Sequence, residues 1–184
     1  MKRRLSYAAG LIVLVMVAFA TSLAEAQVTA PGLYYPTPSW DQKIPASTRF
    51  IVLANWGSAA VLDRETGLVW EKSPSAGTTH FSWFSALYYC STLTLGNRMG
   101  WRLPGLQELA SLVDPSVPSP GPTLPSGHPF QNLQSGGYWS ATTHAEFSEL
   151  ARVLSFYDGS VVNGDKSGLG YAWCVRGGQG LDAQ

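Results

Sequence analysis

Residues 100–109 read GWRLPGLQEL, which places a short strand, a proline and the first turn of a helix in immediate succession. Pro104 ends the strand because its nitrogen carries no hydrogen to donate to a ladder. Gly105 can serve as the N-cap of the helix, and Glu108, three positions later, can reach back to a free backbone amide. The apolar stripe of this helix is predicted to consist of Leu106, Leu109, Ala110 and Val113. We expect the helix to end before Pro115.

A second helix is predicted upstream, over residues 79–93. Either Thr79 or Ser82 can supply the N-cap oxygen. Spacing of i, i+4 and i+7 places one apolar stripe on the buried face, made of Trp83, Leu87 and Cys90 with Phe84 and Ala86 beside them. Cys90 is therefore expected to face the core, where it can be joined to a later strand.

The first 26 residues have the pattern of a secretory signal. The pattern consists of Lys2, Arg3 and Arg4, an apolar segment at 11–20 and the small residues of Ala24-Glu25-Ala26. We predict cleavage after Ala26 and a secreted or periplasmic location, with association at the cell surface left open. A spanning helix needs about 20 apolar residues, and no cysteine follows the apolar segment to carry a lipid. No stable membrane anchor is expected after cleavage.

The chain has two cysteines, Cys90 and Cys174, and both follow the predicted cleavage site. In an oxidising compartment an isolated pair predicts a disulfide. Closing a loop of about 85 residues would contribute roughly 4.6 kcal/mol through the entropy of the unfolded chain. Zinc would need more ligands than these thiols and the scattered His80, His128 and His144 supply. The disulfide would tie the helix at 79–93 to the last strand.

Short apolar runs bounded by turn residues predict strands on both sides of the two helices. The expected strands cover residues 50–53, 59–62, 68–70, 138–142, a hairpin at 151–162 that turns at Asp158-Gly159, and 171–176. In the last strand, alternation places Ala172 and Cys174 on one face and Tyr171, Trp173 and Val175 on the other. Strands, then helices, then strands indicate an α+β domain.

Proline-rich segments flank and interrupt this domain. Residues 27–48 are predicted to form a tail or linker, residues 49–178 the folded domain and residues 179–184 a C-terminal tail. Residues 115–137 contain six prolines and four glycines. This composition predicts a long surface loop.

Composition excludes several classes of protein. Charged residues make up 13% of the 184 residues and aromatic residues 12%, which excludes a disordered chain. The chain has 12 basic and 12 acidic residues, and loss of the signal would leave a net charge of −2. A nucleic-acid binder needs a strongly basic face, so no nucleic-acid partner is expected. Core packing is expected for Trp56, Trp70, Trp83, Trp101, Trp139 and Trp173.

Seven motifs occur in an order that resembles the Lcl C-terminal domain family. They are TGLVWEK (66–72), the Trp-to-Cys helix (83–90), GWRLPGLQEL (100–109), HPF (128–130), YWSATT (138–143), FYDGSV (156–161) and YAWCVRGG (171–178). The resemblance covers about residues 50–178. It implies a compact C-type-lectin-like fold in which two helices pack on a small, mainly antiparallel sheet with one disulfide. It also implies surface adhesion and, from the collagen-like adhesin of the family, sulfated polysaccharides as ligands.

Two features of the resembled proteins are missing from this sequence. It has no collagen-like Gly-X-Y stretch. It also lacks the Glu-Pro-Asn, Gln-Pro-Asp and Trp-Asn-Asp motifs with which true C-type lectins hold calcium, and the segment at 143–151, where their long loop would leave, is short. We therefore expect no metal site and no cofactor.

The late hairpins are the expected recognition surface, because loops on a rigid scaffold usually carry binding. The candidate ligand-binding residues are His144, Arg152, Tyr157 and Lys166. A triad of Ser140, His144 and Asp158 was weighed as a catalytic set, but no G-x-S-x-G motif surrounds the serine. Both cysteines fit the structural disulfide, so the reactive cysteine pair of the fold's sulfatase-modifying relatives is not expected either. We predict no catalytic residue.

These observations favour a secreted, non-enzymatic binding module that acts in adhesion or envelope recognition. Its partner would be a glycan or a surface protein. The alternative is a periplasmic structural or assembly protein that binds another protein, and a hydrolase is a remote third. The sequence does not determine the oligomeric state.

Overall fold

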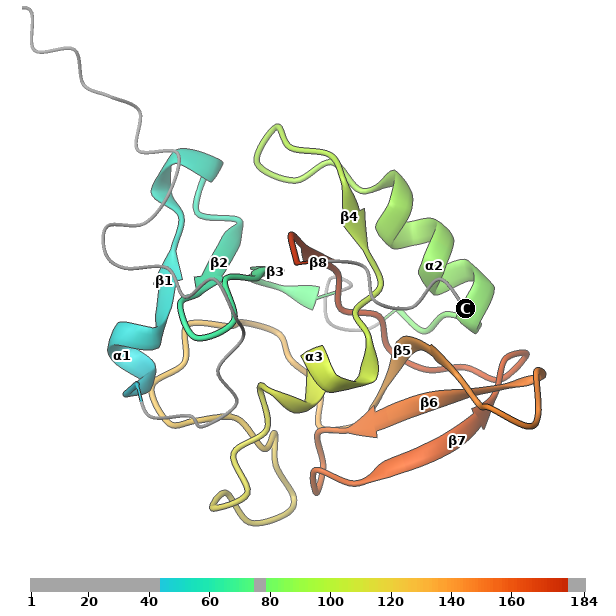
Figure 1. Cartoon of the computed structure of the whole chain (residues 1–184). Coiled ribbons are helices and arrows are strands. Elements are labelled where there is room, and N and C mark those ends of the chain that lie inside the picture. The colour runs from blue at the N-terminus through green and yellow to red at the C-terminus, as the bar shows by residue number, and fades with distance from the viewer. Residues whose placement is uncertain (1–43, 75–78, 179–184) are drawn as a thin grey trace, which may run out of the picture.

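The computed structural model describes residues 44–74 and 79–178 (Figure 1), so the predicted signal and the 179–184 tail lie outside the described residues. The helices in this part are α1 (Ala46–Arg49), the 3-10 turn η1 (Ala54–Trp56), α2 (Trp83–Thr92) and α3 (Leu106–Ala110). The strands are β1 (Phe50–Val52), β2 (Ala60–Asp63), β3 (Val69–Glu71), β4 (Trp101–Arg102), β5 (Gly137–Thr143), β6 (Leu150–Ser155), β7 (Val161–Asp165) and β8 (Val175–Arg176). Helix α1 begins at Ala46, so the last residues of the tail predicted at 27–48 belong to a helix instead.

The strands form antiparallel sheets, which confirms the α+β class. One sheet has the order β1-β2-β3-β8-β4, and the other has the order β5-β6-β7. The structure thus has two sheets where the sequence predicts one. The C-terminal segment contacts both of them. Tyr171 bridges Tyr138 of β5, whereas Val175 pairs with β3 and β4. The more specific expectation of a C-type-lectin-like fold stays a prediction.

Residues 171–176 run between two hydrophobic cores. Ala172 and Cys174 lie in the first core, and Trp173 and Val175 lie in the second, as the alternation predicts. The six tryptophans predicted to be core residues are all buried: Trp56, Trp83, Trp101 and Trp139 in the first core, Trp70 and Trp173 in the second. Only Val175 and Arg176 of the strand predicted at 171–176 form β8, but the segment as a whole contributes to both hydrophobic cores of the described residues.

Helix α2 begins where one of the two predicted caps stands. The Ser82 hydroxyl accepts a hydrogen bond from the Ser85 amide at 3.3 Å. Trp83, Ala86 and Cys90 are buried, but Phe84 is 66% exposed, so its predicted place beside the buried stripe is wrong. Each residue turns the helix by about 100°, and the step from Trp83 to Phe84 carries the ring out of the core.

Helix α3 confirms the predicted N-terminus but is shorter than predicted. The Gly105 amide donates to Oε2 of Glu108 at 2.8 Å, and that carboxylate also binds Arg102 at 2.6 Å. The helix ends at Ala110, which is exposed, and the chain tightens so that the Leu112 amide bonds three residues back to Leu109. Leu112 is consequently fully buried. The predicted apolar stripe contains Val113 at this point and omits Leu112.

The predicted disulfide is present between Cys90 and Cys174. Its Cα atoms are 5.3 Å apart, and both residues are fully buried. The bond joins helix α2 to the segment that leads into β8, which is the connection that the sequence predicts.

The long proline-rich loop predicted at 115–137 contains no helix or strand up to residue 136, and β5 begins at its last residue, Gly137. It is not confined to the surface, however. Leu124 and Phe130 are buried in the second core, where the Phe130 ring lies 4.8 Å from that of Trp173. The predicted surface loop therefore closes one side of a core.

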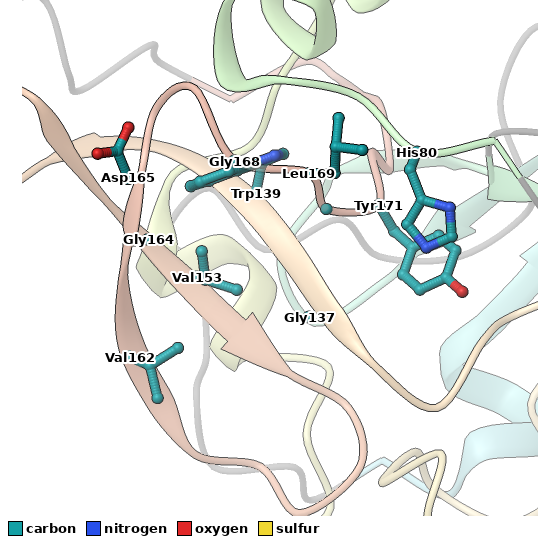
Figure 2. A pocket seen from close by; sticks show the side chains of 11 residues that line it. His80, Gly137, Trp139, Val153, Val162, Gly164, Asp165, Gly168, Leu169 and Tyr171 are labelled. Atoms are coloured by element: carbon teal, nitrogen blue, oxygen red, sulfur yellow. The ribbon is translucent and has the colours of Figure 1, made fainter.

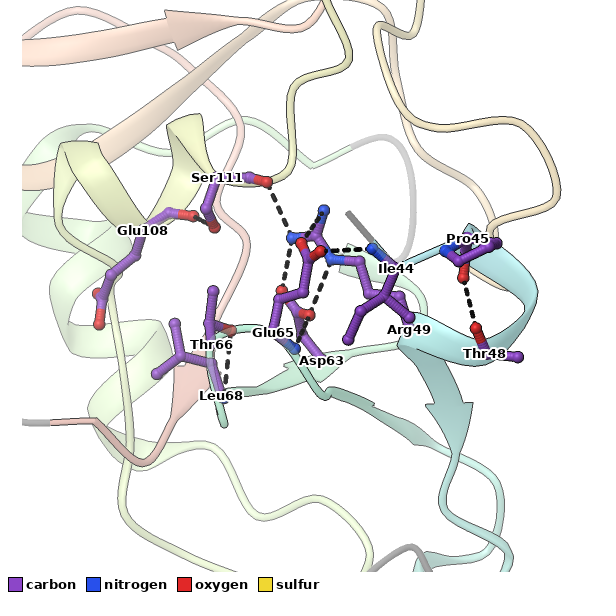
Figure 3. Close-up of polar contacts among 10 residues, drawn as sticks. All are labelled: Ile44, Pro45, Thr48, Arg49, Asp63, Glu65, Thr66, Leu68, Glu108 and Ser111. Carbon is purple, nitrogen blue, oxygen red and sulfur yellow. Dashed lines mark hydrogen bonds and ion pairs between the residues drawn. The ribbon is translucent and has the colours of Figure 1, made fainter. Parts of the chain in front are cut away.

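A buried ion cluster fixes α1 against the turn between β2 and β3 (Figure 3). Arg49 binds both carboxylate oxygens of Asp63, at 2.8 and 2.7 Å, and lies 3.1 Å from Glu65. Its second terminal nitrogen also donates to the Ser111 carbonyl beyond α3, at 2.9 Å. Because Arg49, Asp63 and Glu65 are at most 1% exposed, the turn between β2 and β3 carries its two acidic side chains into the interior.

Candidate functional site

A hollow of about 310 Å³ lies on one face of the β5-β6-β7 sheet, beneath the segment that returns from β7 (Figure 2). Trp139, Val153 and Val162 line it from the three strands. The register places Trp139 opposite Val153 and Val153 opposite Val162, so the three side chains form one row across the sheet. Leu169, on the returning segment, forms the facing wall.

Glycines bring the main chain against the indole of Trp139. A Cβ atom at Gly164 would lie 2.6 Å from Cη2 of that ring, and a Cβ atom at Gly170 would lie 3.0 Å from its Nε1. The same Nε1 donates to the Phe81 carbonyl at 2.8 Å. The ring is 2% exposed and is held from several sides. The floor of the hollow is therefore rigid, and its glycines leave space that side chains would fill.

Polar groups stand at the rim of the hollow. The rings of His80 and Tyr171 lie 4.3 Å apart at one end, and the other face of Tyr171 packs on Tyr138 at 5.2 Å. Figure 2 shows the Asp165 carboxylate at the opposite end, turned away from the apolar row. Its Oδ1 accepts hydrogen bonds from the amide and hydroxyl of Ser167, and these bonds lower the pKa of Asp165.

The size and the lining of the hollow resemble those of small-ligand pockets. The volume is at the lower end of the range of about 300–1,000 Å³ for small-ligand pockets, and the walls are mostly carbon. Neither lysine nor arginine lines the hollow. Within the described residues, no group of three or more His, Cys, Asp or Glu side chains is placed to hold a metal ion.

Comparison with known protein families gives a match. A model of the Lcl C-terminal domain matches residues 59–176, which include the disulfide, every strand except β1, and the residues that line the hollow. The chain belongs to the Lcl C-terminal domain family. A search of curated proteins found no match.

The structure of this Lcl C-terminal domain is compatible with the predicted location. The buried Cys90–Cys174 bond suits an oxidising compartment. No helix in residues 44–74 or 79–178 has the length and apolarity needed to cross a bilayer.

The four predicted ligand-binding residues of the Lcl C-terminal domain spread along the β6–β7 hairpin. His144 and Lys166 lie at one end, where Lys166 donates to the Ser148 carbonyl at 2.7 Å and stands over the Trp83 ring at 4.1 Å. Arg152 lies within β6 and donates to Asn163 at 2.7 Å. Tyr157 lies in the turn at the other end of the hairpin, five residues after Arg152, which corresponds to about 17 Å of extended chain. The four do not form one site or line the hollow, and their ligand role stays a prediction.

The structure does not bring Ser140, His144 and Asp158 together as a catalytic triad. Ser140 is fully buried, and its hydroxyl donates to the Arg152 carbonyl at 2.8 Å. His144 uses Nδ1 to accept the amides of Glu146 and Phe147. Asp158 lies in the turn at the far end of the hairpin, where it binds Ser160.

Glu71 is a buried carboxyl group next to Cys174 of the disulfide, and no pattern in the sequence indicates its raised pKa. Glu71 accepts hydrogen bonds from the Cys174 amide at 2.8 Å and from the Tyr89 hydroxyl at 3.0 Å. Burial raises the pKa of Glu71 from 4.5 to about 7, although both hydrogen bonds oppose the shift. Burial, together with the charge of Glu71, also raises the pKa of Tyr89.

The raised pKa of Glu71 predicts a pH-dependent stability. Between pH 4.5 and 7 the folded protein keeps a proton that the unfolded chain has released. The stabilisation is therefore complete below pH 4.5 and is lost as the pH rises through 7, by about 3 kcal/mol in the free energy of unfolding. Urea titrations at a series of pH values should show this fall.

The Glu71→Gln variant provides the comparison. Its amide is uncharged at every pH, so the fall between pH 4.5 and 7 should disappear. The exposed Glu149→Gln variant should keep it. Parallel curves for wild type and Glu71→Gln would show that Glu71 does not carry the proton.

Proposed function

We propose that this Lcl C-terminal domain is an exported, non-enzymatic binding domain that acts in adhesion or envelope recognition and binds a glycan at the hollow. The observation that carries the proposal is the rigid, glycine-lined hollow floored by Trp139. Sugar rings present C–H faces that pack on apolar and aromatic surfaces, while their hydroxyl groups need partners at the edge. The row of Trp139, Val153 and Val162 supplies the first kind of surface.

The rim supports the same proposal. His80 is exposed, and with Tyr171 it offers an aromatic face and polar atoms at one end of the hollow. The residues that line the hollow bring no cation toward a ligand, so it suits a neutral sugar. A sulfated sugar needs cationic side chains, and two arginines lie together outside the hollow, beside Trp56. Arg98 and Arg176 stand 5.6 and 5.5 Å from the Trp56 ring.

Replacing His80 by alanine is expected to weaken glycan binding by about tenfold, through loss of a stacking face and a polar contact worth roughly 1–1.5 kcal/mol together. The chain without its predicted signal, residues 27–184, is probed on a glycan array, and the affinities of the bound glycans are measured by calorimetry. The comparison variant is His144→Ala, which removes a partly exposed histidine that lies outside the hollow and belongs to the four ligand-binding residues predicted from the sequence, so it tests the hollow against that prediction. It should bind as wild type does.

The array also separates the possible ligand classes. Binding of neutral glycans that changes little with salt supports the hollow. Binding confined to sulfated glycans, weakened by salt and abolished in an Arg98→Ala/Arg176→Ala variant, would move the site to the Trp56 cluster. Equal loss in His80→Ala and His144→Ala would contradict the assignment of the hollow.

A periplasmic assembly protein is the second candidate, and one surface favours it. Phe84 and Tyr88 stand one turn apart on α2 and are 66% and 72% exposed. Exposed aromatic pairs are common at protein interfaces. Absence of any glycan signal, together with a protein partner that loses affinity for a Phe84→Ser/Tyr88→Ser variant, would favour this candidate.

A further inference from the structure

The outer edge of β7 is open. β7 is the last strand of the β5-β6-β7 sheet (Figure 1), and no described strand pairs with its other side. Four of its five residues are exposed. Val161 and Val162 are 43% and 49% exposed, which is high for valine in a strand.

Hydrogen bonds at both ends of the hairpin fix which backbone groups face outward. The Ser155 amide donates to the Ser160 carbonyl at 2.8 Å, and the Lys166 amide donates to the Glu149 carbonyl at 2.9 Å. Because paired residues alternate along an antiparallel ladder, Val162 and Gly164 bond to β6. The backbone groups of Val161, Asn163 and Asp165 therefore point away from the sheet.

These outward groups form a regular row. The described residues provide no backbone partner for the amides of Val161, Asn163 and Asp165 or for the carbonyls of Val161 and Asn163, whereas the Asp165 carbonyl accepts from Gly168. Donors and acceptors thus recur at every second residue, in the pattern that an added strand requires.

The edge lacks the features that usually prevent strand addition. Natural edges are protected by lysine, proline, a bulge or a covering segment. The residues of β7 are VVNGD, and their register with β6 is continuous from Leu150 opposite Asp165 to Leu154 opposite Val161. An exposed apolar edge with an unbroken register is suited to pairing.

We propose that the β7 edge binds an extended, proline-free, basic segment of a partner protein, which adds a strand to the β5-β6-β7 sheet. The proposal goes beyond glycan binding and does not depend on it. Backbone hydrogen bonds to Val161 and Asn163 provide the affinity. A side chain of the segment beside Val162 would cover that residue at the border of the hollow.

Charge explains why the segment is basic. The exposed acidic residues of this hairpin and its loops are Glu146, Glu149, Asp158 and Asp165. Its two cations, Arg152 and Lys166, are already engaged with Asn163 and with Ser148. Hydrogen bonds from Ser160 lower the pKa of Asp158, and those from Ser167 lower that of Asp165, so both stay charged.

The same charges argue against a second copy of the chain as the occupant. Antiparallel pairing of two β7 strands would bring the acidic ends of both copies to one seam, where like charges repel. A seam of two five-residue strands also falls far short of the roughly 1,200–2,000 Å² that stable interfaces bury.

The test uses random nonapeptides displayed on phage, selected on residues 27–184 of the chain and counter-selected on Asn163→Pro. Proline removes an outward amide and projects its ring from the edge, and edge positions tolerate it. Asn163→Thr is the matched control, because it also loses the contact with Arg152 but keeps the amide. Circular dichroism and urea unfolding verify that both variants are folded.

Enriched peptides are then synthesised with and without N-methyl groups at alternate residues. This measurement does not depend on any variant of the protein. We expect lysine- or arginine-containing peptides without proline, bound more than about tenfold more weakly by Asn163→Pro than by Asn163→Thr. Methylation on one set of alternate residues should cause a similar loss, and methylation on the other set should cause little.

Three results would overturn the proposal. They are the absence of enriched peptides, equal binding of both methylated forms, and enrichment of acidic peptides. Dimerisation in sedimentation experiments that is abolished by Asn163→Pro, without peptide binding, would identify a second copy as the occupant instead.

Discussion

Replacing Arg49 by methionine is expected to lower the free energy of unfolding by about 3–5 kcal/mol, because it leaves two buried carboxylates without their cation. Asp63 and Glu65 are at most 1% exposed, and the guanidinium lies 2.7 Å from one and 3.1 Å from the other. The contact with the Ser111 carbonyl is lost as well. Urea unfolding followed by tryptophan fluorescence measures the change.

Two further variants isolate the effect of charge. Arg64→Met changes the neighbouring, partly exposed arginine of the same turn and should cost less than about 0.5 kcal/mol. The triple variant Arg49→Met/Asp63→Asn/Glu65→Gln removes the uncompensated charges and should recover part of the loss. If Arg49→Met and Arg64→Met were equally stable, the cluster would contribute nothing to the fold.

Removing the disulfide with Cys90→Ala/Cys174→Ala is expected to cost a comparable amount, about 2–5 kcal/mol. The bond joins residues 84 positions apart, so its loss restores much freedom to the unfolded chain. Both sulfurs also lie within the first core, where alanine fills less space. Denaturant midpoints of the variant and of the oxidised wild type give the difference.

Mass measurement provides the control for this experiment. Intact mass before and after reduction with alkylation should show one disulfide in the wild type and no free thiol before reduction. Wild type unfolded in the presence of a reductant should approach the variant. A difference below about 1 kcal/mol between oxidised wild type and variant would show that the bond is not a main source of stability.

Local patterns were the most predictable from the sequence. The bond between Glu108 and the Gly105 amide spans three residues, and the alternation along 171–176 is a property of one short segment. Phe84 was misplaced because helical spacing alone does not determine how wide the buried stripe is. Here the stripe is only wide enough for Trp83, Ala86 and Cys90.

Interactions between distant segments were not predictable in the same way. Asp63 and Glu65 have the composition of an exposed turn, and nothing near them in sequence indicates that Arg49 folds over them. The raised pKa of Glu71 arises from burial, in a part of the fold where the neighbouring Cys174 amide comes from 103 positions away.

The sequence contains a trace of the hollow, but composition alone does not show what it means. Residues 164–170 contain three glycines, which read as turn composition. Their role depends on Trp139, because it is the indole that Gly164 and Gly170 approach so closely. Only the paired register of β5, β6 and β7 brings those residues together.

The place of residues 171–176 between the two cores determines when the domain can fold. This segment comes late in the sequence, yet Trp173 lies in one core and Cys174 in the other. Neither core can close before the segment is in place, and it meets residues of both cores that lie far away in the sequence. Folds dominated by such contacts form slowly. The two cores are therefore expected to form together, as one cooperative unit.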